Sequence, residues 1–410
     1  MQKSLRGQAM IKGGDTAWIL VSVALVMLMT LPGLAVFYGG LAKRKDVLNT
    51  IGMSLITYIL VSILWVIYGY TLCFSGDVSG IIGNLSKVFL NGVLPNTTSG
   101  SIPEVVFAAY QLTFAAITVA LISGSYIERM SVGAWLLFSL LWFTFVYAPI
   151  AHWVWGGGFL AKKGVLDFAG GIVVHLTAGI AGLVGALVLG KRKEPVLKPH
   201  NMTLVVIGTG LLWFGWFGFN GGSALAANGV AGTAVLNTNT AAAVAAFSWM
   251  LVEWLTTGKP TILGICSGAI GGLATITPAA GFVNLKGAFI IGILAGIIPY
   301  FVITVVKEKL GYDDALDVFN IHGVGGILGT ILTGIFADPA INGSAGLLYG
   351  NPAQLGIQLF AVVVSIIYVA IVTLVIFGIV KVFTKLRVSE EEEYTGLDSS
   401  QHGENAYSLD

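Results

Sequence analysis

The sequence predicts an all-α polytopic membrane protein that crosses the bilayer with eleven transmembrane helices. Of its 410 residues, 56% are hydrophobic and only 10% are charged, and the mean hydropathy is +0.88. Soluble domains carry about 25% charged residues, so the chain lacks the polar surface that a cytosolic enzyme needs. The near balance of 21 basic and 20 acidic residues gives no reason to expect a nucleic-acid partner.

Apolar runs long enough to cross a bilayer follow one another along the chain. A hydrocarbon core of about 30 Å requires roughly 20 helical residues. The runs are too long and too uniformly apolar for barrel strands, so each predicts a helix. The second run is long enough to contain a bend. In order, the runs cover residues 17–39, 48–75, 102–124, 133–151, 168–190, 202–220, 235–256, 262–282, 285–307, 318–337 and 353–380.

Basic residues in the connections predict the orientation of the spans. An odd number of spans places the termini on opposite sides, and loops rich in lysine and arginine stay in the cytoplasm. The connections on the side of the C-terminus hold 14 basic residues and the others hold 7, among them Lys3, Arg6 and Lys12. We therefore expect an outside N-terminus, with residues 1–15 as a short leader. The polar tail over 381–410 is expected in the cytoplasm.

The fifth and tenth spans indicate an internal repeat. His175 follows Asp167 by eight residues, and His322 follows Asp317 by five, each before a glycine-rich helix. Because the two segments are five spans apart, the halves would insert in opposite senses, as an inverted five-plus-five repeat. Such repeats place a transport pathway at their interface, with the eleventh span peripheral. The unequal spacings predict a symmetry that is only approximate.

Ionisable groups inside spans are costly and each is a functional hypothesis. Two histidines at matching places, His175 and His322, favour a pore lining over a structural role, because neutral imidazole both donates and accepts hydrogen bonds. A metal site is the weaker alternative, since no third ligand is near. Cys73 and Cys266 lie in apolar runs and indicate neither a disulfide framework nor a metal cluster. Asp167, at the mouth of the fifth span, is interpreted as a helix cap with an indirect electrostatic effect.

Aromatic residues gather in three segments that read AYQLTF, AHWVWGGG and LLWFGWFGFNGGS. We interpret Trp153 and Trp213 as members of an interfacial belt. Trp155, Phe114 and Ser223 suggest a site for a small cation, because aromatic faces attract a desolvated cation by about 2 kcal/mol or more. The chain lacks nucleotide-binding and voltage-sensing motifs, so passive conduction or secondary transport remains.

Together these segments resemble the Amt/MEP/Rh family of ammonium transporters, over nearly the whole chain. The most specific matches are DFAGGIVVH, AHWVWGGG, WFGFNGGSA, SGAIGGLATITPAAG and the IHG of the tenth span. The resemblance implies eleven spans, a homotrimer in the cell (inner or plasma) membrane and one narrow apolar pore per subunit. We expect no cofactor and no metal. Family tails are bound by PII signalling proteins, and the tail of this chain resembles that pattern.

The resemblance also implies roles for individual residues. It assigns Trp155, Phe114 and Ser223 to an outer ammonium-binding site, with Tyr110 at its edge where phenylalanine is frequent. Trp155 favours the Amt branch over the Rh branch. Deeper in the pore, the resemblance implies a gate of two phenyl rings, a pore-side tryptophan, twin histidines and a supporting aspartate, which are Phe114, Phe219, Trp216, His175, His322 and Asp167.

These observations predict an ammonium transporter, with methylammonium as an expected analogue. Ammonium is recruited outside and deprotonated, and ammonia crosses an apolar pore into the cytoplasm, with or without the proton. Two alternatives stay open. The same fold can serve as an ammonium sensor that signals through its tail with little flux, or as an Rh-type gas channel, which Trp155 and Ser223 disfavour.

Overall fold

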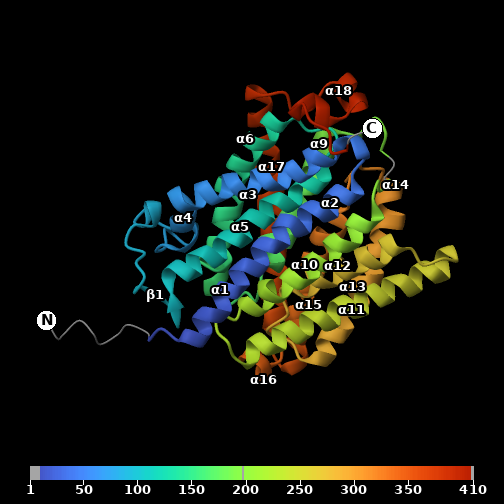
Figure 1. Ribbon diagram of the computed structural model, residues 1–410. Helices are drawn as coiled ribbons and strands as arrows, with labels where there is room; N and C mark the ends of the chain where they lie inside the picture. The colour runs from blue at the N-terminus through green and yellow to red at the C-terminus, as the bar shows by residue number, and fades with distance from the viewer. Residues whose placement is uncertain (1–9, 196–197, 408–410) are drawn as a thin grey trace.

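The computed structural model describes residues 10–195 and 198–407, so Lys3, Arg6 and most of the expected leader lie outside the described residues. In this part of the chain, ten helices are long and apolar enough to cross a membrane, and the shorter apolar helix Ile262–Ile276 supplies the eleventh. The prediction of an all-α polytopic membrane protein is confirmed. Figure 1 shows the helices packed side by side, with β1 and α16 at one end and α18 at the other.

Most spans of the first half consist of consecutive helical pieces, because π-helical turns interrupt them. They are α1 (Gly13–Leu28), η1 (Met29–Leu34) and α2 (Ala35–Leu41); η2 (Arg44–Asp46), α3 (Val47–Leu64), η3 (Trp65–Gly69) and α4 (Tyr70–Phe74); α5 (Glu104–Tyr126); α6 (Val132–Trp142), η5 (Phe143–Tyr147) and α7 (Ala148–Val154); and η6 (Gly171–Leu176) and α9 (Thr177–Leu189). The end of the bundle that carries β1 is called the outer end, after the orientation that the basic residues predict. Its connections add η4 (Val88–Leu90), the hairpin of β1 (Thr98–Ser99) and β2 (Ile102–Pro103), and α8 (Phe159–Lys163).

In the second half, as far as the structure describes it, π-helical turns occur only in the ninth and tenth spans. Its elements are α10 (Met202–Gly222); α11 (Gly229–Thr257); α12 (Ile262–Ile276); α13 (Leu285–Phe301), η7 (Val302–Lys307) and α14 (Glu308–Leu310); and η8 (Phe319–Gly323) and α15 (Val324–Phe336). After α16 (Pro339–Asn342) and η9 (Leu347–Tyr349), the last span is α17 (Pro352–Phe383), and the tail holds α18 (Glu390–Thr395) and η10 (Asp398–His402).

The eighth span is shorter than predicted. Its helix, α12, ends at Ile276, whereas the apolar run continues to residue 282. Pro278 follows two residues later and cannot donate the backbone hydrogen bond that would continue the helix. Residues 277–282 therefore form turns at the outer end of the bundle, and Phe168 donates its N–H to the carbonyl of Pro278.

The two halves match more closely than the sequence suggested. His175 lies in η6 and His322 in η8, and each π-helical turn is followed by an α-helix of 13 residues. The carboxylate that caps η8 belongs to Asp314, which accepts hydrogen bonds from the backbone N–H groups of residues 318 and 319. Asp314 precedes His322 by eight residues, as Asp167 precedes His175. Asp317, the expected counterpart, instead pairs with Lys307.

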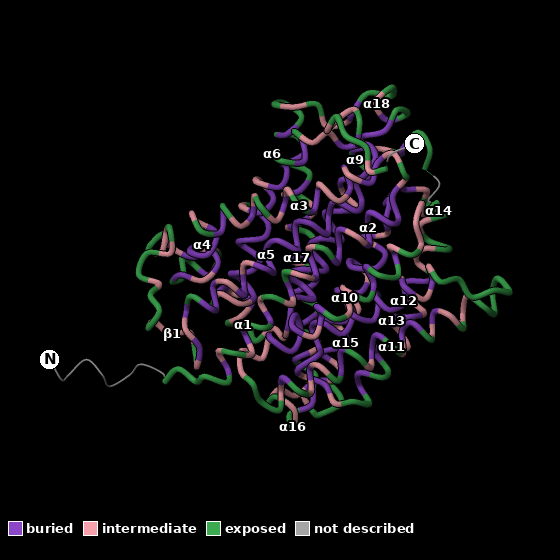
Figure 2. The backbone as a smooth tube through the Cα atoms, in the orientation of Figure 1, coloured by how far each residue is buried: buried purple, intermediate pink, exposed green. Residues whose placement is uncertain are grey.

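Burial varies strongly from span to span. In the most apolar stretch of α5, 83% of residues are buried, whereas only 33% are buried in the corresponding stretch of α17. Figure 2 shows the buried backbone concentrated through the middle of the bundle, where α5 lies. The exposed apolar side chains of outer helices such as α17 suit contact with lipid. The spans α5 and α9 therefore form the centre of the bundle.

Candidate functional site

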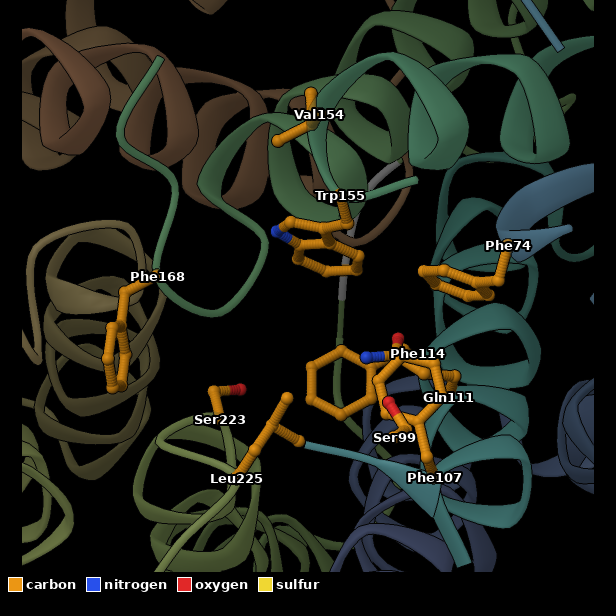
Figure 3. Close-up of a pocket in the computed structure, with 10 residues that line it drawn as sticks. All are labelled: Phe74, Ser99, Phe107, Gln111, Phe114, Val154, Trp155, Phe168, Ser223 and Leu225. Carbon is orange, nitrogen blue, oxygen red and sulfur yellow. The ribbon is translucent and has the colours of Figure 1, made fainter. Parts of the chain in front are cut away.

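A cavity of about 400 Å³ opens between the outer ends of α5, α7 and α10. It brings together Trp155, Phe114 and Ser223, which come from three different elements: the residue after α7, the middle of α5 and the residue after α10. Figure 3 shows their side chains around one opening. Most of the lining is apolar or aromatic, and its members are Phe74, Ser99, Phe107, Gln111, Phe114, Val154, Trp155, Phe168, Ser223 and Leu225.

Tyr110 does not line this cavity. Its side chain is fully buried behind Phe114, with the two rings edge to face at 4.9 Å. The Tyr110 hydroxyl lies 2.8 Å from the carbonyl oxygen of Gly218 and 3.3 Å from Oγ of Ser223. The Ser223 hydroxyl donates to the carbonyl of Phe219 at 2.8 Å. Tyr110 thus supports the end of α10 and the hydroxyl of Ser223 from behind.

Two phenyl rings close the floor of the cavity. The rings of Phe114 and Phe219 stack with centroids 4.2 Å apart and an interplanar angle of 22°. Phe114 touches the cavity, whereas Phe219 is fully buried and lies 6.0 Å from the ring of His175. The stacked pair therefore stands between the outer cavity and the buried histidine.

The two histidines meet directly beyond the rings. Nδ1 of His175 lies 3.1 Å from Nδ1 of His322, so one imidazole donates and the other accepts. Nε2 of His175 is buried and has no hydrogen-bond partner among the described residues. Trp216 stacks on His175 at 5.3 Å and is held by a hydrogen bond from its indole N–H to Thr277 at 2.9 Å. In the described part of the chain, no third metal-binding side chain joins the pair.

Asp167 caps the π-helical turn that carries His175. Its Oδ1 accepts the N–H groups of Gly170 and Gly171, at 2.9 and 2.6 Å, and its Oδ2 accepts those of Ile172 and Val173, at 2.8 and 3.2 Å. These four groups have no partner inside their own helix, which is why a carboxylate suits this position. The charge thus stabilises the start of the fifth span, as the capping interpretation expected.

Asp167 also connects this cap to the cavity. Its carbonyl oxygen accepts the indole N–H of Trp155 at 2.9 Å. The preceding residue, Leu166, is held by the buried side chain of Gln358 on α17, which accepts from the N–H of Leu166 at 2.8 Å and donates to its carbonyl at 2.7 Å. Gln358 also donates to Thr330. The lipid-exposed span α17 therefore holds the segment whose Asp167 positions the indole of Trp155 and caps the turn that carries His175.

Replacing Gln358 with leucine is expected to destabilise the protein by about 2 kcal/mol, because it leaves the partly buried N–H and C=O of Leu166 without these partners. Thermal unfolding in detergent measures the effect. Gln354 donates to only one backbone group, the carbonyl of Gly164, so Gln354→Leu is a matched variant with a smaller expected loss. Equal unfolding temperatures for Gln358→Leu and the unaltered protein would contradict this role.

Trp153 does not belong to an interfacial belt. It is only 6% exposed, its indole N–H donates to the carbonyl of Ile81 at 2.9 Å, and its ring packs on Tyr368 and Phe159. The side chain anchors the outer loop between α4 and α5 onto the bundle. Trp213, the other predicted belt residue, is half-buried.

Seven of the ten lining residues are not predicted from the sequence, and two of them lie on α5 beside Phe114. Phe107 and Gln111 face the cavity together with Phe114. Their spacing is the signal that could have found them, because residues four and three positions apart lie on one face of a helix. The other five come from elements that only the tertiary structure brings to the cavity.

A second polar region lies at the opposite end of the bundle. Arg192 pairs with Glu128 and Asp313 at 2.9 Å each, and all three are buried. Burial alone would raise the pKa of Asp313, but the hydrogen bonds and charge of Arg192 lower it. The tail packs against the same end, where Asp398 accepts the N–H of Asn49 at 2.8 Å. The tail therefore docks on its own chain.

Eleven apolar helices packed into one bundle define a polytopic membrane protein, and a cavity opens at one end of the bundle. Comparison with known proteins makes this class specific. The model of the Ammonium Transporter Family matches residues 17–407. The chain is 56% identical over 403 residues to an ammonium transporter of Aquifex aeolicus, which covers 98% of this chain and 95% of that relative. The chain belongs to the Ammonium Transporter Family, with relatives of the Amt type.

Solved structures agree with this assignment. The crystal structure of Mep2 from Saccharomyces cerevisiae superimposes with a TM-score of 0.87 at 39% identity, covering 93% of this chain and 91% of Mep2. A Sensor Amt Protein superimposes with a TM-score of 0.88 at 28% identity, covering 95% of this chain and 98% of its own. Both likenesses cover more than nine-tenths of this chain.

Proposed function

We propose that this protein takes up ammonium, binding the cation in the outer cavity and passing ammonia across the membrane through the histidine pair. The observation that carries the proposal is the stacked pair of Phe114 and Phe219. It separates a cavity suited to a cation from two buried imidazoles, of which that of His175 is fully buried. A charged species is favoured on one side of the rings and a neutral one on the other.

The cavity offers an ammonium ion two kinds of contact. The faces of Trp155 and Phe114, whose rings meet edge to face at 5.8 Å, attract a cation through their π-electrons. The Ser223 hydroxyl donates a hydrogen bond to the backbone carbonyl of Phe219, so its oxygen can still accept a hydrogen bond from the cation. Ammonium donates such bonds and can lose a proton, whereas potassium, an ion of similar size, can do neither.

Beyond the rings, the surroundings favour neutral ammonia. Moving a naked charge into an apolar interior costs several kcal/mol or more. The free Nε2 of His175 offers a hydrogen-bonding group to a solute that has left water. His322 provides a second imidazole beside the first, so ammonia can pass from a hydrogen bond with His175 to one with His322. The proton that ammonium has lost either moves through the two imidazoles or stays outside.

We further propose the setting in which the protein works. Family membership supports a homotrimer in the cell membrane, with the N-terminus outside and the C-terminus in the cytoplasm. The excess of basic residues in the connections on the side of the tail supports this orientation. Residues 1–380 form the transport domain, and residues 381–410 form a regulatory tail. We propose that a PII-type signalling protein binds this tail.

Reconstitution in liposomes tests the proposal. Ammonium is pulsed on one side while charge movement and internal pH are recorded, with potassium and sodium as controls. A saturable current specific to ammonium shows that net charge crosses, and internal alkalinisation without current shows that ammonia crosses alone. Either result supports transport. The absence of both signals in a correctly folded preparation would refute it.

Replacing Ser223 with alanine is expected to raise the apparent KM for ammonium about tenfold, because one hydrogen bond to a charged group is lost. The same liposome assay measures this change. Ser365→Ala is the matched control, since Ser365 is buried on α17, has no hydrogen-bond partner among the described residues and does not line the cavity. An unchanged KM in Ser223→Ala would count against the outer binding site.

A sensor is the second candidate function. The likeness to a Sensor Amt Protein and the docking of the tail against the inner end of the bundle support it. A sensor binds ammonium in the outer cavity with little flux. Binding without a current or an alkalinisation in the liposome assay is the result that would favour it.

A further inference from the structure

Gln111 is a buried polar side chain that the cation site described above does not use. It lies on α5, is 8% exposed and lines the outer cavity. Its Oε1 is buried and has no hydrogen-bond partner among the described residues. Buried polar groups are nearly always paired, so an unpaired one that borders a cavity calls for an explanation.

Gln111 lies at a position on α5 from which its side chain can contact an ion bound in the cavity. It follows Phe107 by four residues and precedes Phe114 by three, so the three side chains share the helix face that the cavity exposes. Figure 3 shows the carboxamide of Gln111 beside the Phe114 ring. The side chain is therefore placed among the aromatic residues that attract a cation.

The cavity is poor in hydrogen-bond acceptors without Gln111. A cation that gives up its water must find acceptors for its N–H groups, because unpaired donors in a dry site are costly. Ser223 supplies one acceptor, its hydroxyl oxygen, while its O–H donates to the carbonyl of Phe219. Ser99, in the β1 hairpin, and Gln111 are the other members of the cavity lining with polar side chains.

We propose that the carboxamide oxygen of Gln111 is a second hydrogen-bond acceptor for the ammonium ion in the outer cavity. This inference rests on the proposed function and names a residue that determines its affinity. A half-turn about the Cγ–Cδ bond exchanges the oxygen and the nitrogen of the carboxamide. Since no partner holds the oxygen, this rotation breaks no hydrogen bond there, and it turns the acceptor toward the cation.

Two variants of matched size test the proposal. Gln111→Met keeps the length of the side chain and removes the acceptor, whereas Gln111→Glu keeps an acceptor and adds charge. The liposome assay gives KM and the maximal flux for ammonium, and the thermal shift caused by methylammonium in detergent measures binding without transport. We expect Gln111→Met to raise KM about tenfold with little loss of maximal flux, the effect of one hydrogen bond to a charged group.

The conservative variant separates binding from packing. Gln111→Glu is expected to keep KM at or below that of the unaltered protein, and only Gln111→Met should lose the thermal shift. A purely structural role predicts that both variants fail alike, and that result overturns the proposal, as does an unchanged KM in Gln111→Met. If the unaltered protein shows the thermal shift but no flux, the proposed transport function fails while the thermal shifts of the variants still decide the role of Gln111.

Discussion

Replacing His175 with alanine is expected to lower ammonium-driven flux about a hundredfold, which corresponds to about 3 kcal/mol. His175 is fully buried, stands next to Phe219 on the path inward and shares a 3.1 Å contact with His322. Its removal takes away the first hydrogen-bonding group beyond the rings and leaves His322 without its partner. Ammonia would then cross this stretch with no polar contact.

The contact between the two imidazoles makes the effects of their removal non-additive. We expect His322→Ala and the double variant to reduce flux about as much as His175→Ala alone, because each single change already breaks the pair. Flux is measured in liposomes, and size-exclusion chromatography checks that the assembly is unchanged. Flux at the level of the unaltered protein in His175→Ala, or strictly additive losses in the double variant, would show that the pair does not act as a unit.

Replacing Asp167 with asparagine is expected to destabilise the protein by about 3 kcal/mol or more and to abolish transport. Each carboxylate oxygen of Asp167 accepts two backbone N–H groups. Asparagine has only one carbonyl oxygen, so its NH₂ group would face two of these donors and leave them buried without partners. The turn that carries His175 would loosen, and the carbonyl that holds the indole of Trp155 would shift with it.

A second capping aspartate provides the control for this prediction. Asp338 caps α16 at the same end of the bundle and accepts a single backbone N–H there, from Ala340 at 2.9 Å. Asparagine is as good a cap as aspartate at such a position. It would lose only one partly buried side-chain hydrogen bond, which the other oxygen of Asp338 accepts from Asn284 at 2.8 Å, so Asp338→Asn should cost about 1 kcal/mol. Thermal unfolding and the liposome assay are run on both variants. Equal stability losses would show that the loss at Asp167 is not specific to its four-fold cap.

Much of the fold follows from local properties of the chain. Each transmembrane run is recognisable because its own residues are apolar over the length of a bilayer, whatever they later contact. The same argument fails at the end of α12, where the residues remain apolar while Pro278 ends the helix. It fails again at Trp153, because the local sequence around a buried tryptophan is as apolar as that around an interfacial one and does not distinguish the two.

In the internal repeat, the sequence pattern and the structure assign the capping role to different residues. The sequence pairs Asp167 with Asp317 because both follow a leucine, yet Asp314 caps the second turn. Which carboxylate meets the free N–H groups depends on the direction of the backbone before the helix, and a positive φ of 59° at Asp317 turns the chain there. A motif comparison cannot see that turn.

The sequence by itself determined the membrane class, the spans, the repeated histidines and the aromatic residues of the outer segments, because composition and spacing are properties of neighbouring residues. Only the tertiary structure decided that His175 and His322, 147 positions apart, touch through Nδ1. It also decided that Tyr110 stands behind the cavity while Gln111 borders it, and that Gln358 holds the loop before Asp167. These relations depend on how helices far apart in the chain pack and rotate against one another, and one sequence does not encode that in any local pattern.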